Sequence, residues 1–163
     1  MNNQKDSNYK HVILIASIFL QFCLGATYSW SVFVEPLKLF LHKSQGLVQF
    51  PFSVFYTCFP CTMLFTGYAI DKFGIRPVGV FGVFLFALGW LSAGFFGLNI
   101  QIITLFIGVL GGIGVGFAYM VPIKACMQWF PQHKGLATGL AVAGFGGGAA
   151  LLSQAGRYLM EIH

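Results

Sequence analysis

The side chains best suited to contact a polar ligand lie along one side of a long apolar segment near the N-terminus. Ser17, Gln21, Gly25 and Tyr28 fall within one narrow sector when successive residues are placed about 100° apart, as in a helix. Polar groups inside a bilayer face the bundle interior or a water-filled cavity. The pattern therefore predicts that Gln21 and Tyr28 line a substrate cavity. Hydrogen bonds to neighbouring helices would explain it equally well.

Two further aromatic residues within the apolar segments are given roles by the sequence. Tyr119 lies on the fourth apolar segment and is another candidate for the cavity. Trp30 points to the opposite side of its helix, and we expect it to be an interfacial anchor because indole rings favour the membrane–water boundary.

The residue sets that support catalysis or metal binding are missing from the sequence. The pair Cys58 and Cys61 lies in the middle of an apolar segment, where desolvation disfavours the thiolate that redox or metal chemistry needs. The four histidines are dispersed over segment ends and loops. The glycine spacing from Gly112 to Gly116 is no dinucleotide-binding loop, because no strand precedes it. We therefore expect no enzyme activity, no catalytic residues, no metal and no cofactor.

The composition places the chain in a membrane. Of its 163 residues, 57% are hydrophobic and only 8% are charged, whereas soluble domains carry about 25% charged residues. The formal charge of +5 comes from scattered cations without a basic cluster, so a nucleic-acid partner is excluded. A soluble globular enzyme and a disordered chain are excluded as well. The fold class that remains is all-α, a polytopic membrane helix bundle whose first partner is the lipid bilayer.

Five segments are long and apolar enough to cross a hydrocarbon core of about 30 Å as helices. They run approximately over residues 12–34, 50–70, 77–98, 100–121 and 136–156. Residues 35–49 and 122–135 are expected to be connectors.

The distribution of lysine and arginine predicts a cytoplasmic N-terminus. With this orientation, six cations lie inside and three outside, in agreement with the positive-inside rule. The inside group is Lys5, Lys10, Lys72, Arg76, Lys124 and Lys134, and the outside group is Lys38, Lys43 and Arg157.

Glycine stripes on the last two segments predict close helix packing. Gly108, Gly112 and Gly116 repeat every four residues on the fourth segment. Gly135 and Gly139 begin a second stripe, which continues through Ala143 and Gly147. Small residues with this spacing let helix backbones touch in a membrane.

A short charged hairpin joins the second and third segments. Its marked positions are Gly67, Asp71, Lys72, Gly74 and Arg76. An ordinary charged turn would explain them, since an acid, a turn glycine and two cations suit such a connection. The spacing also resembles the signature loop of the major facilitator superfamily, G-x-x-x-D-[RK]-x-G-x-[RK]. That resemblance implies that the loop latches one half of a transporter to the other, with Asp71 and Arg76 as gate residues.

Two longer stretches resemble one family of that superfamily, the oxalate/formate antiporters. Residues 25–37, GATYSWSVFVEPL, are similar to the end of that family's first helix. Residues 111–122, GGIGVGFAYMVP, are similar to its fourth helix. The likeness continues through WFP at 129–131, GLATG at 135–139 and AGFG at 143–146.

The resemblance implies an antiporter of small organic anions of the oxalate, formate or monocarboxylate type in a bacterial cytoplasmic membrane. The cationic substrate ligands of that family lie in its second half. We therefore expect residues 1–163 to be an N-terminal part, with the sixth span, the linker and the second bundle absent. Two alternatives stay open: a truncated remnant or split half that needs a partner polypeptide, and a small scaffold protein that self-associates through its glycine stripes.

Overall fold

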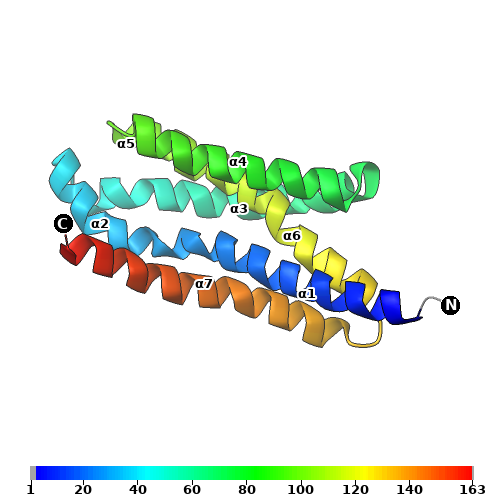
Figure 1. Cartoon of the computed structure of the whole chain (residues 1–163). Coiled ribbons are helices and arrows are strands. Elements are labelled where there is room, and N and C mark those ends of the chain that lie inside the picture. Colours follow the sequence, from blue (N-terminus) through cyan, green and yellow to red (C-terminus); the bar gives the residue numbers. More distant parts are fainter. Residues whose placement is uncertain (1–2, 163) are drawn as a thin grey trace. The chain divides into compact units, whose positions relative to one another are not determined.

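The computed structural model describes residues 3–162, with side chains for residues 9–158, and this range is built from helices (Figure 1). In chain order the elements are α1 (Asn3–Leu24), the 3₁₀ segment η1 (Gly25–Ser29), α2 (Trp30–Leu41), α3 (Gln45–Phe73), α4 (Ile75–Phe96), α5 (Ile100–Ile103), the π-helical segment η2 (Thr104–Gly111), α6 (Gly112–Trp129) and α7 (Lys134–Ile162).

Within the described residues, five helical stretches are long and apolar enough to cross a membrane, which confirms the predicted all-helical membrane fold. They cover Tyr9–Leu41, Gln45–Phe73, Ile75–Phe96, Ile100–Trp129 and Lys134–Tyr158.

Two of these stretches continue well past the C-terminal ends expected from the sequence. The first continues through α2 to Leu41, with Pro36 inside the helix. The fourth continues past Pro122 to Trp129. A proline removes one backbone hydrogen bond, and in membrane helices neighbouring groups can satisfy the carbonyl that it frees. Proline therefore does not end these helices, and much of each expected connector is helical.

The chain forms two compact units. Unit 1 contains residues 1–29 and 122–163, and unit 2 contains residues 30–121. The boundaries fall between η1 and α2 and within α6, directly before Pro122.

Unit 1 is built on α1 and α7, which run side by side in the same direction (Figure 1). Glycine allows the contact: a Cβ at Gly144 would lie 2.6 Å from the carbonyl oxygen of Ile18, and one at Gly148 would overlap the carbonyl oxygen of Phe22. A second cluster, Cys126, Ala137 and Ala141, packs with Leu14 and Phe130. Small residues thus bring the two backbones into direct contact.

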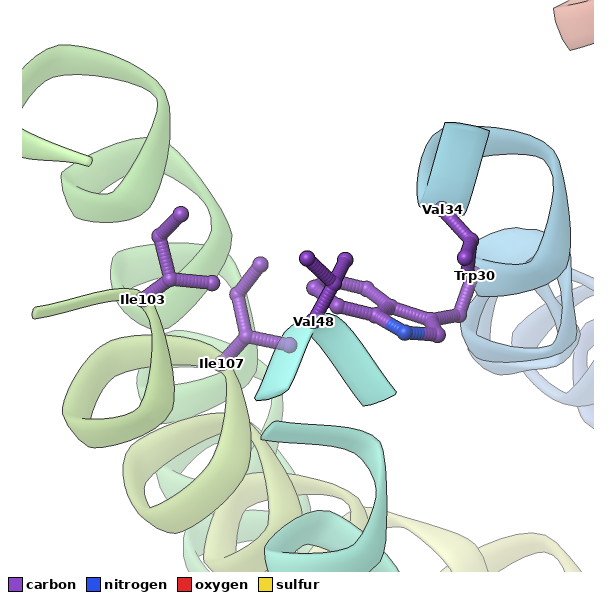
Figure 2. Close-up of a cluster of buried hydrophobic side chains, with 5 residues drawn as sticks. All are labelled: Trp30, Val34, Val48, Ile103 and Ile107. Carbon is purple, nitrogen blue, oxygen red and sulfur yellow. The ribbon is translucent and has the colours of Figure 1, made fainter. Parts of the chain in front are cut away.

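Unit 2 packs α3 and α4 against the π-helical segment η2. A buried cluster joins α2, α3, α5 and η2 through Trp30, Val34, Val48, Ile103 and Ile107 (Figure 2). The indole of Trp30 lies beside Val48 in this cluster, and only 2% of the residue is exposed.

The expectation that Trp30 is an interfacial anchor is therefore wrong. The extrapolation along the helix fails at η1, where the chain turns about 120° per residue instead of about 100°. Over the five residues of η1 the difference amounts to about 100°. This extra rotation carries Trp30 away from the side that a continuous α-helix would give it.

Candidate functional site

The polar sector predicted near the N-terminus forms the inner side of α1. Ser17 is 5% exposed and Gln21 is fully buried at 0%. An amide in the interior of a membrane protein needs hydrogen-bonding partners, because lipid supplies none. Gln21 therefore has the location expected of a group that contacts either another helix or a polar solute.

Tyr28 lies beyond this buried pair, in η1, and is 44% exposed. Its ring meets Phe145 of α7 edge to face, with the ring centroids 5.3 Å apart. The 3₁₀ turn that carries it is supported locally by Thr27, whose hydroxyl donates a hydrogen bond to the carbonyl of Leu24 at 3.1 Å. Gly25 lets the turn approach α7, since a Cβ there would overlap the carbonyl oxygen of Phe145. Tyr28 is thus held by α7 while part of its surface stays accessible.

Tyr119 belongs to unit 2, whereas Gln21 and Tyr28 belong to unit 1. It lies on α6, half-buried, and its ring packs edge to face on Phe59 of α3 at a centroid distance of 5.3 Å. The structure therefore gives Tyr119 an aromatic packing role within its own unit.

The charged hairpin lies where α3 ends and α4 begins. Asp71, Lys72 and Arg76 are exposed there. Gly74 makes the turn with φ of +91°, a backbone conformation that side chains with a Cβ rarely adopt, and its N–H donates to the carbonyl of Ile70 at 2.8 Å. A Cβ at Gly67 would meet no described atom within 4 Å. The loop thus presents its charges outward from a turn that requires glycine.

Gly108, Gly112 and Gly116 all face α3. A Cβ at Gly108 would lie 3.0 Å from the carbonyl oxygen of Pro51, and one at Gly112 would lie 2.9 Å from that of Phe55. At Gly116 a Cβ would lie 2.5 Å from Cβ of Thr62 and 2.9 Å from the carbonyl oxygen of Phe59. The three glycines form one continuous seam with α3, which we call the α3–α6 seam.

On α7, the structure places close packing on a different face from Gly135 and Gly139. A Cβ at either position would meet no described atom within 4 Å. The face toward α1 carries Ala137, Ala141 and Gly144. Small residues occur all around this helix, so the four-residue repeat alone does not identify the packed face.

Sequence reasoning missed two polar residues within the spans. Thr66 is fully buried, and its hydroxyl donates to the carbonyl of Gly116 at 3.0 Å as well as to that of Thr62 at 2.9 Å. Its position one turn after Thr62, facing a glycine stripe, was the available signal. Lys124 lies half-buried inside α6, where we expected a connector. The apolar residues that follow Pro122 were the signal for a continuing helix.

The His, Cys, Asp and Glu side chains decide whether the described part of the chain can hold a metal ion. Among the residues that the structure describes, no group of three His, Cys, Asp or Glu side chains could hold a metal ion. Cys58 and Cys61 are free thiols. On α2, Lys38 and Glu35 form an ion pair at 2.9 Å near the end of the first span. What Gln21, Tyr28 and Tyr119 can offer a ligand is hydrogen-bonding and aromatic groups.

Comparison with known proteins relates the chain to membrane transporters. The sequence model of the Major Facilitator Superfamily matches residues 15–163. The chain is 30% identical over 146 residues to the "Uncharacterized MFS-type transporter YhjX" of Escherichia coli (strain K12), an alignment that covers 88% of this chain and 36% of that protein. It is 31% identical over 134 residues to the "Oxalate:formate antiporter" of Oxalobacter formigenes, covering 82% and 32%. It is 30% identical over 172 residues to "Monocarboxylate transporter 9" of Gallus gallus, covering 97% and 31%. The chain thus spans about a third of the length of these relatives.

Proposed function

The chain belongs to the major facilitator superfamily, and we propose that it forms the N-terminal part of a transporter for small organic anions. The observation that carries the proposal is the alignment of most of the chain with relatives named as an oxalate:formate antiporter and a monocarboxylate transporter. Members of this superfamily are transporters, so the proposed activity is transport without chemical conversion. Oxalate, formate and monocarboxylates are the substrate class.

Gln21 and Tyr28 are the side chains that we propose to contact the substrate, with Tyr119 as a further candidate. The phenol of Tyr28 is partly accessible and can donate a hydrogen bond to a carboxylate. Gln21, buried on α1 of the same span, would contact the anion when the transporter opens. Neither group is charged, so cations outside this chain would offset most of the desolvation of the anion.

The site assignment is tested by the exchange kinetics of the complete transporter in proteoliposomes. Tyr28→Phe and Gln21→Ala should each raise the KM for a small carboxylate about tenfold or more, because each removes a hydrogen bond to a charged group. Tyr158→Phe and Gln154→Ala are matched controls, since both residues are exposed on α7. If Gln21 only joins helices, Gln21→Ala should lower the stability of the transporter and leave its KM unchanged. An unchanged KM in both Tyr28→Phe and Gln21→Ala would refute the site assignment.

The charged hairpin is proposed to act as the gate, with Asp71 and Arg76 as its main residues. Both are exposed and follow the superfamily spacing together with Gly67, Lys72 and Gly74. Asp71→Asn should slow exchange while leaving the equilibrium affinity for substrate unchanged, because a gate residue does not touch the substrate. An affinity loss without a rate change would contradict this role.

We also propose that the protein lies in the cytoplasmic membrane with its N-terminus inside. The hairpin cations Lys72 and Arg76 and the cation Lys134 at the start of α7 would then face the cytoplasm. In a cysteine-free background, single cysteines at Ser7 and at Lys43 test the orientation. A membrane-impermeant maleimide applied to intact cells should label position 43 and leave position 7 unlabelled, and the reverse labelling would contradict the proposal.

A second candidate function is assembly with another polypeptide or with a second copy. The observation that favours it is the open face of α7, where a Cβ added at Gly135 or Gly139 would meet no described atom within 4 Å. Small residues on an exposed membrane helix can support association by close packing. Crosslinking in mild detergent should then yield a dimer that Gly139→Leu abolishes, and a monomer throughout would count against assembly.

A further inference from the structure

We propose that the hairpin end of unit 2 is a binding site for an anionic phospholipid. The site consists of an apolar groove between α3, α4 and α6 together with the cations at its rim. We call it the hairpin groove. It is lined by Ala69, Phe73, Pro77, Val78, Phe81 and Phe117 and encloses about 300 Å³.

The chemistry of the groove fits an acyl chain. All six lining residues are apolar and supply no side-chain hydrogen-bonding group to a polar solute. Phe81 and Phe117 meet edge to face, with ring centroids 5.6 Å apart, and thereby join α4 to α6 along the groove. From Pro77 to Phe81 the groove follows α4 for four residues, a rise of about 6 Å, which suits the first part of a lipid tail beneath its headgroup.

The rim supplies the charge that selects the headgroup. Lys72 and Arg76 directly precede the lining residues Phe73 and Pro77, and both cations are exposed. The ammonium of Lys72 lies 5.3 Å from the ring centroid of Phe73 and 6.0 Å from that of Tyr68. The aromatic rings thus hold the cation beside Phe73, which lines the groove.

Charge and groove together favour one occupant. Asp71 brings one negative charge against the two positive charges of Lys72 and Arg76, so the loop keeps a net charge of +1. A free anion would gain nothing from the apolar lining, and a neutral lipid would gain little from the cations. A phospholipid with a net negative headgroup uses both, since basic residues beside membrane helices attract anionic lipids.

The test is lipid binding to the delipidated full chain in detergent, followed by native mass spectrometry. Phosphatidylglycerol and phosphatidylcholine with identical acyl chains are titrated separately. We expect phosphatidylglycerol to bind more tightly, by about fivefold for each cation that contacts it. Lys72→Gln and Arg76→Gln should each remove about fivefold of that preference. Lys134→Gln, which removes an exposed cation at the first residue of α7, is the control and should leave the preference unchanged.

A second pair of variants tests the groove. Ala69→Phe fills it and should weaken the binding of both lipids, whereas Val80→Phe adds the same bulk at a residue of α4 that is 71% exposed and outside the groove. Equal binding of the two lipids, or an unchanged preference in Lys72→Gln and Arg76→Gln, would overturn the proposal. Competition by inorganic phosphate alone would identify a simple anion site and would overturn it too.

Discussion

Replacing Gly116 with alanine adds one methyl group to the α3–α6 seam. The new Cβ would lie 2.5 Å from Cβ of Thr62 and 2.9 Å from the carbonyl oxygen of Phe59, so the two helices must separate. Overpacking of this kind costs about 1–3 kcal/mol. The separation also lengthens the hydrogen bond from Thr66 to the carbonyl of Gly116, and such bonds contribute about 0.6 kcal/mol in membrane proteins.

An intrinsic gain opposes this loss. Alanine is favoured over glycine inside a helix by about 0.5–1 kcal/mol. The net prediction for Gly116→Ala is therefore a destabilisation of about 1–3 kcal/mol. Gly139→Ala is the matched control, because its Cβ would meet no described atom within 4 Å, and it should stabilise the chain by about 0.5–1 kcal/mol.

The assay is reversible unfolding in mixed micelles, followed by far-ultraviolet circular dichroism across a titration with denaturing detergent. The two variants should shift the midpoint in opposite directions from that of the parent chain. A Gly116→Ala chain as stable as Gly139→Ala would mean that the α3–α6 seam is looser than the contacts at Gly116 indicate, and it would overturn this prediction.

Three further predictions follow from single contacts and use the same unfolding assay. Thr66→Val keeps the side-chain shape but removes the hydrogen bond to the carbonyl of Gly116 on α6, so it should lower the free energy of unfolding by about 0.6 kcal/mol. Thr57→Val is the control and should cost less, because the hydroxyl of Thr57 bonds only within α3. Equal losses of stability in the two variants would contradict an interhelical role for Thr66. Gly74→Ala should destabilise the hairpin by about 1–2 kcal/mol, because the backbone φ of +91° is unfavourable for alanine. Gly46→Ala is the control and should be neutral or stabilising, because its Cβ would meet no described atom within 4 Å. A neutral Gly74→Ala would contradict the predicted backbone strain at this position. Trp30→Ala should cost about 3–5 kcal/mol, since the ring is buried in the core of unit 2, and a loss below about 1 kcal/mol would restore the anchor interpretation.

The spanning helices could be predicted from the sequence because their signal is local. Each is a run of apolar residues long enough to cross the bilayer, and the hairpin turn is marked by Gly74 between charged residues. The ends were less predictable. Connectors were expected from residues 35 and 122, but both helices continue past Pro36 and Pro122, because a single proline inside a packed membrane helix leaves enough hydrogen bonds for the helix to continue.

The orientation of individual side chains depended on structure that the sequence does not signal. The 3₁₀ segment at Gly25–Ser29 rotates everything that follows, which is why Trp30 is buried against expectation. On α7, a glycine repeat starting at Gly135 has the same spacing as the packed face at Gly144 and Gly148. Only the approach of α1 distinguishes the two faces, and that approach is a tertiary contact.

The candidate site was predictable in composition and less so in geometry. A glutamine in an apolar helix indicates a buried hydrogen-bonding group, and Gln21 is fully buried. Helical periodicity placed Tyr28 in the same sector, yet it lies in the 3₁₀ turn with almost half of its surface exposed. Lys124 was expected in a connector because its helix was expected to end before it, whereas it lies inside α6.

The proposed transport of small organic anions is tested most directly by counterflow. The gene product is purified from its native membrane, reconstituted into liposomes loaded with unlabelled oxalate, formate or lactate, and supplied with the labelled anion outside. We expect transient accumulation of label that saturates with concentration and is absent for labelled glucose. A preparation that exchanges none of these carboxylates, while a reconstituted oxalate:formate antiporter does so under the same conditions, would contradict it.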